Sequence, residues 1–211
     1  MALTQEQREL VSEITRLSGG GKRLSSTSRV HGIYSSFTVP PFDSLKAVRD
    51  TAKRYVDWGV DVKGKIVADY GCNVGALAVE LARQGASFVY GFEFNFERVA
   101  FCDRLFKHLG LKGKFANADF RISVPICFGV PDIVFCCSVD SYVADWKKLY
   151  AGLAAVGSKM LCIESNRQDI SCNGTWTYLD SLGFDVEYIG KGDSGGISRR
   201  REMFRCTRRS S

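Results

Sequence analysis

The first 18 residues carry the pattern of an amphipathic helix. Thr4 and Gln7 stand at the spacing of a capping box, in which each side chain accepts a hydrogen bond from the other residue's backbone N–H. The apolar residues behind this box recur at helical spacing, at Leu10, Val11, Ile14 and Leu17. The pattern predicts a helix with one buried face, which ends at the glycine run 19–21.

A long irregular stretch, residues 22–41, follows this helix and is rich in serine and basic residues. Loops of this length are usually either functional or disordered, and the aromatic residues Tyr34 and Phe37 favour a packed loop. Apolar residues then recur at helical spacing over residues 43–58, which predicts a second helix.

From residue 64 onward, short apolar runs alternate with helical segments. The runs predict strands at 65–69, 87–93, 114–117, 132–137, 159–163, 184–189 and 202–207. Continuous apolar strands separated by helices are typical of a parallel sheet covered on both faces, and right-handed crossovers make such a sheet doubly wound. No helix separates the last two strands, so they are expected to form an antiparallel hairpin at the sheet edge. The expected fold is α/β, with a doubly wound, mostly parallel seven-stranded sheet, an antiparallel last strand and an N-terminal helical extension.

The composition agrees with one globular domain. The 211 residues are 45% hydrophobic and 25% charged, which are ordinary values. No apolar run approaches the roughly 20 residues of a membrane span, and the N-terminus lacks the pattern of a secretory signal. Three of the eight cysteines, Cys136, Cys137 and Cys162, lie in apolar runs, and no pair has the CxxC spacing of a zinc site. We expect a cytoplasmic protein with reduced thiols and no metal.

Positive charge gathers near the C-terminus. Residues 191–211 carry seven basic and two acidic residues, a net charge of +5 out of +6 for the whole chain. The basic clusters are Lys22, Arg23 and Arg29 in the N-terminal loop and Arg199, Arg200 and Arg201 near the end. Such clusters bind phosphates or RNA, or they are solvated surface, and the sequence leaves both readings open.

A glycine-containing turn lies where the first strand of the alternating region meets its helix. Gly71 and Gly75 allow the backbone to turn tightly and to approach a ligand without a Cβ clash. In open α/β sheets, ligands bind at the carboxyl ends of the strands. Glu93 ends the second strand, where a carboxylate can accept both hydroxyls of a ribose, and Asp119 and Phe120 follow the third.

This pattern resembles that of the class I S-adenosylmethionine-dependent methyltransferases, over roughly residues 42–208. The family's motif is acid-x-Gly-x-Gly-x-Gly, and residues 69–75 run DYGCNVG, so that Asn73 replaces the middle glycine. This DxGCNxG variant is similar to that of methyltransferases of modified tRNA and RNA ends, and of related bacterial small-molecule enzymes. The resemblance implies residues 42–211 as a Rossmann-like methyltransferase domain, preceded by residues 1–41 as a helix and lid-like loop.

The resemblance also implies S-adenosyl-L-methionine as cofactor and assigns its site. The glycine turn lines the amino acid and sulfonium of the cofactor, Glu93 holds the ribose, and Asp119 with Phe120 flanks the adenine. The full set assigned to the cofactor is Asp69, Gly71, Cys72, Asn73, Gly75, Glu93, Phe94, Asp119, Phe120 and Ser138.

A nicotinamide- or flavin-binding domain is the competing interpretation of a strand, a glycine turn and a later acid. The pyrophosphate fingerprint Gly-x-Gly-x-x-Gly is absent, because Asn73 and Ala76 occupy its second and third glycine positions. Asp69, just before the turn, also suits a cationic ligand better than a diphosphate.

Polar residues after the fourth and fifth strands are candidates for substrate handling. Asp140 is a candidate proton acceptor or binder of a substrate amine, and Tyr142 a pocket residue; the alternative is a helix cap formed by Ser138, Asp140 or Ser141. Glu164 and Asn166 are candidate substrate contacts, or simply a solvated strand end.

The loop before the core supplies two further candidates. His31 is a candidate general base because its ordinary pKa lies near neutrality, and Tyr34 is a candidate substrate contact in a lid that excludes water. The alternative for His31 is a surface position in a packed loop.

Three functions remain open from the sequence. The first is methyl transfer to a small-molecule or sugar-like acceptor, since no RNA-binding module is recognisable. The second is methylation of tRNA or RNA ends, which the motif variant and the basic clusters favour. The third is a non-catalytic cofactor-binding partner subunit, against which the intact turn and Glu93 argue. The oligomeric state is left undetermined.

Overall fold

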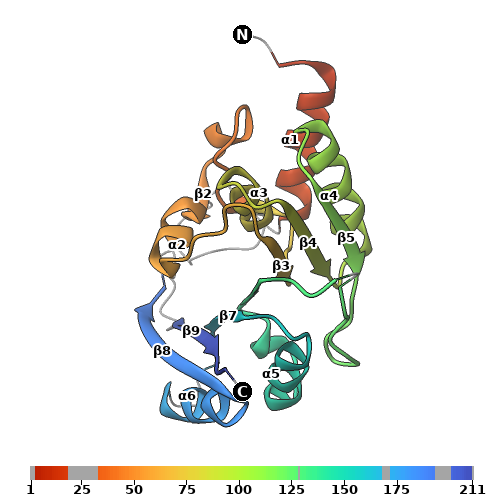
Figure 1. The fold of residues 1–211 in the computed structure, drawn as a ribbon. Helices are drawn as coiled ribbons and strands as arrows, with labels where there is room; N and C mark the ends of the chain where they lie inside the picture. Colours follow the sequence, from red (N-terminus) through yellow and green to blue (C-terminus); the bar gives the residue numbers. More distant parts are fainter. Residues whose placement is uncertain (1–2, 19–32, 128, 168–171, 193–200, 211) are drawn as a thin grey trace, which may run out of the picture.

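The structure, a computed structural model, describes residues 3–18, 33–127, 129–167, 172–192 and 201–210. Its centre is a seven-stranded sheet (Figure 1). In spatial order the strands are β5 (Gly113–Asn117), β4 (Phe88–Glu93), β3 (Ile66–Tyr70), β6 (Ile133–Cys137), β7 (Met160–Ser165), β9 (Glu202–Arg208) and β8 (Phe184–Lys191). The first five are parallel, and β9 runs antiparallel to both β7 and β8. The predicted fold class and all seven predicted strands are confirmed.

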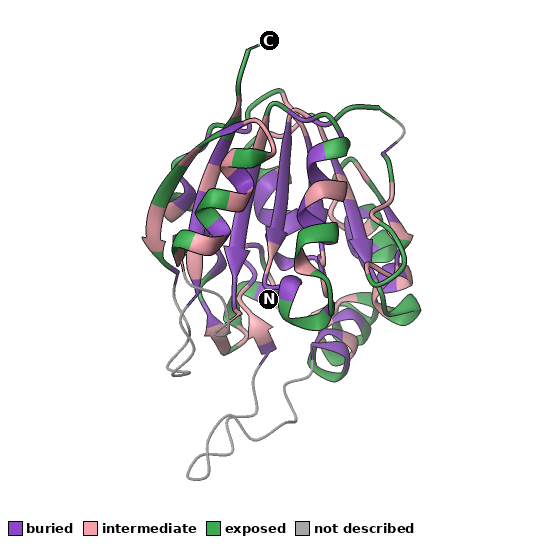
Figure 2. Cartoon of the chain, turned by 90° about the horizontal axis from the view of Figure 1, so that it is seen from below, coloured by how far each residue is buried: buried purple, intermediate pink, exposed green. Residues whose placement is uncertain are grey.

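Helices cover both faces of this sheet. The helices are α1 (Gln5–Leu17), α2 (Thr51–Trp58), α3 (Ala76–Arg83), α4 (Phe96–His108), α5 (Trp146–Ala155) and α6 (Cys172–Ser181). One buried apolar cluster packs helices α1, α2, α3 and α4 against one face of the sheet. A second cluster packs α5 and α6 against the other face. Figure 2 shows the buried central strands between helices that are exposed on their outer sides. All eight cysteines lie in the described part of the chain, and each is a free thiol.

The N-terminal helix forms as the capping pattern predicts. The Thr4 hydroxyl accepts from the Gln7 backbone N–H at 3.2 Å, and the Gln7 side chain accepts from the Thr4 N–H at 3.0 Å. Helix α1 then packs on α4, where Arg16 pairs with Glu97 at 2.7 Å. This contact places the N-terminal extension beside the carboxyl end of β4.

The predicted helix over residues 43–58 is wrong in its first half. Residues Phe42–Ser44 form a 3-10 turn and Ala47–Arg49 form a strand, β2, which pairs in parallel with β1 (Ile33–Ser35). Helix α2 begins only after Asp50, whose side chain accepts from the Lys53 N–H at 3.0 Å. Strand pairing with a distant segment overrides local helical spacing here. The β1–β2 ladder crosses the boundary predicted at residues 41/42, which stays a prediction.

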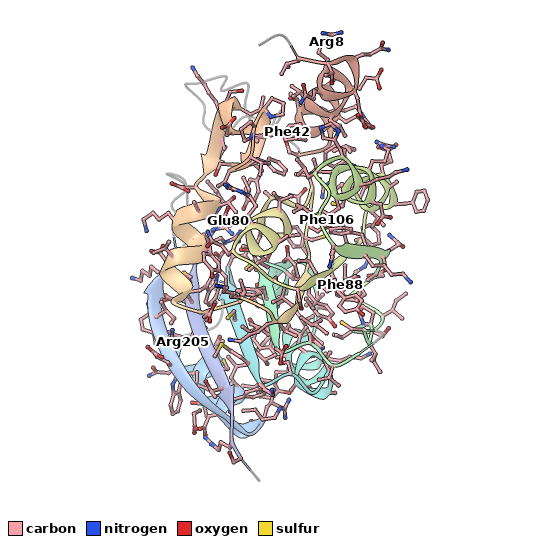
Figure 3. The ribbon with its side chains drawn as sticks, turned by 45° about the horizontal axis from the view of Figure 1, so that its top comes forward. Arg8, Phe42, Glu80, Phe88, Phe106 and Arg205 are labelled. Atoms are coloured by element: carbon pink, nitrogen blue, oxygen red, sulfur yellow. The ribbon has the colours of Figure 1, made fainter. Side chains whose placement is uncertain are left out.

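The C-terminal strand is tied to the end of α2. Arg205 of β9 donates to the Trp58 and Gly59 carbonyls at 2.9 and 3.0 Å, and Figure 3 labels Arg205 beside these elements. The contact satisfies carbonyls that the end of a helix leaves without partners. It fixes α2, and the arginines that α2 and β2 carry, against the second half of the sheet.

Candidate functional site

The glycine turn follows β3 directly and lies against the end of β4. The N–H groups of Gly71 and Cys72 both donate to the Phe92 carbonyl, at 2.8 and 3.1 Å. Gly71 has φ +84° and Gly75 has φ +78°, a region that favours glycine. Asn73 has φ +54°, and asparagine is among the few other residues that adopt this conformation readily. The geometry therefore explains why asparagine is accepted at the middle glycine position.

Gly71→Ala is expected to lower the free energy of unfolding by about 2–4 kcal/mol. A Cβ at Gly71 would lie 2.4 Å from the Val139 side chain, in addition to the strain of its positive φ. Gly64→Ala is the matched control, because Gly64 has φ +72° with no neighbouring atom within 4 Å. It should lose about 1–2 kcal/mol, the strain alone. Urea denaturation measures both, and equal losses would contradict a special role for the Val139 contact.

Glu93 lies beside this turn. It is 8% exposed, and its carboxylate accepts from the Asn73 N–H at 3.1 Å and from the Asn95 N–H at 3.1 Å. Arg98 adds a third contact at 3.3 Å and also donates to the Leu17 carbonyl at the end of α1. The carboxylate that the sequence assigned to a ribose thus lies within hydrogen-bonding distance of the turn assigned to the cofactor.

Asp69 is the buried acid at the base of the site. It is 2% exposed, and one carboxylate oxygen, Oδ2, finds no hydrogen-bond partner among the described residues. Burial raises the pKa of Asp69 to about 7, against the lowering effect of Arg54, while Glu93 raises it further. A buried carboxylate with an unused oxygen beside a glycine turn is suited to a cationic ligand.

The raised pKa of Asp69 predicts a pH-dependent stability. An unfolded aspartate titrates near about 3.9, whereas Asp69 in the folded protein has a pKa of about 7. Between these values the folded state binds the proton more tightly, so this contribution to stability is present at low pH and is lost as the pH rises toward 7. The wild-type protein should therefore lose stability relative to Asp69→Asn from pH 4 to 7. Urea denaturation at stepped pH measures this, and a pH-independent difference would contradict it.

The residues assigned to the adenine, Asp119 and Phe120, both follow β5, and Phe94 of the cofactor set follows β4. Asp119 accepts from Arg121 through both carboxylate oxygens, at 2.8 and 2.7 Å, and this hydrogen bonding lowers the pKa of Asp119. The Arg121 guanidinium lies over the exposed Phe94 ring, 4.7 Å from its centre, and the Phe120 ring is 6.0 Å from that of Tyr70. The structure brings these residues to one edge of the sheet. Both carboxylate oxygens of Asp119 already accept hydrogen bonds from Arg121.

Glu164 belongs to a buried ion cluster, which the sequence analysis missed. Its carboxylate pairs with Arg49 and Arg54 at 2.9 Å each and with Arg201 at 3.0 Å, and it accepts from the Ser138 hydroxyl at 2.6 Å. Burial alone would raise the pKa of Glu164, but Arg54 and Arg49 hold it below its ordinary value. Glu164 is 1% exposed, so the alternative of a solvated strand end is wrong, and its predicted substrate contact gains no support.

Arg201 also belongs to this buried ion cluster. The sequence placed it in a basic surface cluster, but it is 4% exposed and bonded to Glu164, Ser138 and Tyr34. The Tyr34 hydroxyl accepts from Arg201 at 2.8 Å, so that Tyr34, predicted to lie in a loop but part of β1, reaches the cluster. The other members of the two basic clusters, and His31, lie outside the described residues.

Asp140 lies in a buried hydrogen-bond network instead of facing open space. Its carboxylate accepts from the Tyr150 hydroxyl at 3.0 Å, the Asn166 N–H at 3.3 Å and the Ser165 hydroxyl. Burial raises its pKa despite these hydrogen bonds. The role of proton acceptor stays a prediction, and the geometry favours Asp140 as a residue that positions Asn166.

The helix-cap alternative for residues 138–141 is wrong. Helix α5 is capped by Asp145, which accepts from the Lys148 N–H at 3.0 Å, and Asp140 lies in a separate 3-10 turn, Asp140–Tyr142. Tyr142 is exposed, whereas Asn166 is buried. Ser138, directly after β6, has φ +62°, an uncommon conformation for serine that is often found at functional sites.

A concave pocket of about 200 Å³ lies elsewhere, between α2 and the β8–β9 pair. Lys53, Asp57, Ile189, Gly190, Lys191 and Met203 line it. It contains none of the residues that the sequence assigned to cofactor or substrate. The contact between Glu93 and the glycine turn is therefore a stronger indication of the functional site than this pocket, because it brings together a carboxylate and a tight backbone turn.

Part of the chain that carries the turn is similar to known proteins. Residues 68–159 match a family model described as a methyltransferase domain. The ubiquinone biosynthesis O-methyltransferase of Neisseria meningitidis serogroup C (strain 053442) is 40% identical over 52 residues, which are 25% of this chain and 22% of that protein. The match thus spans about a fifth of that curated relative.

Solved structures, one of them named as a methyltransferase, share the fold. Magnesium protoporphyrin IX methyltransferase of Synechocystis PCC 6803, with bound S-adenosylmethionine, superposes with a TM-score of 0.60 at 20% identity, over 75% of this chain and 76% of that one. The YcgJ protein of Bacillus subtilis superposes with a TM-score of 0.63 at 11% identity, over 74% and 97%. None of the described helices has the length and apolar character that crossing a bilayer requires.

Proposed function

We propose that this chain, whose residues 68–159 match the model of a methyltransferase domain and whose fold is shared with solved methyltransferases, is an S-adenosylmethionine-dependent methyltransferase acting on a small molecule. The observation that carries the proposal is the contact between Glu93 and the glycine turn at Asn73. A carboxylate and a tight backbone turn meet there, at the carboxyl ends of adjacent parallel strands, where ligands bind in open α/β sheets.

The residues present fit the cofactor. The unused oxygen of buried Asp69 is suited to the cationic ammonium of the amino acid moiety. Gly71 and Gly75 give the turn after Asp69 the positive φ angles that it needs. Glu93 and Phe94 would hold the ribose, Asp119 and Phe120 the adenine, and Cys72, Asn73 and Ser138 complete the set. S-adenosylmethionine supplies a methyl group on a sulfonium that is already activated for displacement.

The protein's own contribution to transfer is therefore positioning. Holding acceptor and methyl donor in line supplies most of the rate in such a reaction. Asp140 would act by orienting Asn166 and Ser165, to which it is hydrogen-bonded. His31 remains the proposed base for an acceptor that must lose a proton, and Tyr142 and Asn166 remain proposed acceptor contacts.

A small-molecule acceptor is favoured over RNA by two observations. The similar proteins are named as an O-methyltransferase of ubiquinone biosynthesis and a magnesium protoporphyrin IX methyltransferase, and neither name mentions RNA. The C-terminal basic cluster also provides less surface charge than its sequence suggested, because Arg201 is buried in an ion cluster. RNA methylation is the second candidate through the remaining basic residues.

The test combines binding and transfer. Calorimetry should show binding of S-adenosylmethionine and S-adenosylhomocysteine, and deuterated cofactor should label a metabolite in a mixture that is analysed by mass spectrometry. Label in nucleosides of RNA, with an activity that falls steeply with salt, would favour the RNA alternative. Absence of cofactor binding would refute the proposal, and binding without any transfer would favour a non-catalytic subunit.

A further inference from the structure

Three arginines from separate parts of the chain meet around one glutamate at the carboxyl end of β7. Arg49 ends β2, Arg54 lies on α2 and Arg201 directly precedes β9. Each pairs with Glu164 within 3.0 Å, and all four side chains are buried. We call these four residues the arginine cluster.

Among the described residues, three guanidinium groups of this cluster share one carboxylate. Glu164 is the carboxylate that contacts all three guanidinium groups. Asp69 also interacts electrostatically with Arg54, and it is only partly ionised near neutral pH because its pKa is about 7. The neighbouring thiol of Cys137 stays neutral, since burial raises its pKa to about 12. Buried charge that lacks a counter-charge is costly, and an anionic ligand would supply one.

Arg201 has a donor available for such a ligand. Its Nε is buried and has no hydrogen-bond partner among the described residues, although its other nitrogens contact Ser138, Glu164 and Tyr34. A guanidinium group presents its donors as a planar fork, which matches carboxylate and phosphate. Tyr34, which accepts from Arg201, is only half-buried and forms the outer side of the cluster.

The cluster lies on the side of the sheet away from the proposed ribose site. Glu164 stands opposite Cys137 of β6, and β6 in turn pairs with β3. Two strand spacings, or about 10 Å, therefore separate the β7 position from β3. Glu93 lies in the opposite direction, on β4. Most residues assigned to the cofactor thus lie at the ends of β3, β4 and β5, whereas Glu164 of the cluster lies on β7. Ser138, which follows β6, borders both sites through its contact with Glu164.

We infer that the arginine cluster binds an anionic group, a carboxylate or a phosphate, of the molecule that receives the methyl group. The identity of that molecule as methyl acceptor rests on the proposed function, whereas anion binding by the cluster does not. The acceptor is accordingly an acidic small molecule, whose charged group is held by Arg201 beside Ser138.

Inorganic phosphate is the probe for the site. Calorimetry at constant ionic strength, with chloride replaced by phosphate, should show saturable binding to the wild-type protein. Arg201→Met should weaken this binding about tenfold or more. Arg209→Met is the matched control, because Arg209 follows the same strand but pairs with Asp180 and Asp185 at the surface. Absence of phosphate binding to the wild-type protein, or equal binding by Arg201→Met, would overturn the inference.

A second variant and a competition measurement distinguish an anion of the acceptor from the carboxylate of the cofactor. Arg201→Lys, checked for folding by circular dichroism, keeps the charge without the fork and should bind phosphate between wild type and Arg201→Met. Saturating S-adenosylhomocysteine should leave phosphate binding intact. If it displaces phosphate while 5′-methylthioadenosine, which lacks the carboxylate, does not, the anion is that of the cofactor and the acceptor assignment is overturned. A protein that binds phosphate but no S-adenosylhomocysteine would refute the proposed function alone.

Discussion

Replacing Glu164 with alanine is expected to lower the free energy of unfolding by about 3–5 kcal/mol. The variant leaves Arg49, Arg54 and Arg201 buried beside one another without the carboxylate that pairs with all three. Removing one partner of a buried ion pair is strongly destabilising, because the remaining charge is neither solvated nor compensated. For a domain of this size the loss corresponds to a decrease in Tm on the order of 10 °C.

Urea denaturation and thermal unfolding followed by circular dichroism measure this effect. Glu187→Ala is the matched control, since Glu187 pairs with Arg205 at 2.6 Å but its side chain is 58% exposed. Exposed pairs contribute about 0–1 kcal/mol, so the control should unfold nearly as the wild type does. A Glu164→Ala protein as stable as the control would mean that the three arginines are solvated, and would also remove the basis for the anion site.

Replacing Glu93 with alanine is expected to weaken S-adenosylhomocysteine binding by about 10- to 100-fold. The carboxylate lies beside the glycine turn and is suited to accept hydrogen bonds from both ribose hydroxyls. Each hydrogen bond to a charged group contributes about 1.5–3 kcal/mol. Since Glu93 also accepts from the Asn73 and Asn95 N–H groups, its loss should loosen the turn itself.

Calorimetric titration measures the affinity, with two comparison variants. Glu97→Ala removes an exposed carboxylate on the adjacent helix, which pairs with Arg16, and should bind the nucleoside as the wild type does. Glu93→Gln keeps the size of the side chain and one acceptor oxygen but loses the charge. Its affinity for S-adenosylhomocysteine should lie between that of Glu93→Ala and that of the wild type. Unchanged affinity in Glu93→Ala would show that the ribose is held elsewhere.

Local sequence specifies the glycine turn and Glu93 of the site, but it does not specify the contacts of Asp119. The turn depends on residues close together in the chain, where Gly71 and Gly75 need positive φ angles and Asn73 tolerates one. Glu93 is also predictable from the sequence, because it is the last residue of the next apolar strand. Asp119 and Phe120 follow the third strand as their sequence positions predict, and their adenine role stays a prediction. The hydrogen bonds between Asp119 and Arg121 appear only in the structure.

The sequence by itself determined the seven strands of the main sheet and their succession along the chain, the capping box of α1 and the glycine turn. Each of these depends on residue spacing and on backbone preferences within a few positions, which the chain records directly. Tertiary structure decided where local spacing yields to distant contacts. Residues Ala47–Arg49 became a strand because β1 pairs with them, although their spacing is helical.

Tertiary structure alone also decided which charges are buried together. Arg49 and Arg54 precede Glu164 by 115 and 110 residues, and Arg201 follows it by 37. Charged residues look alike along a chain, because their type does not reveal whether water or another charge will surround them. Only the packing of α2, β7 and β9 against one another converts three ordinary arginines into a buried cluster.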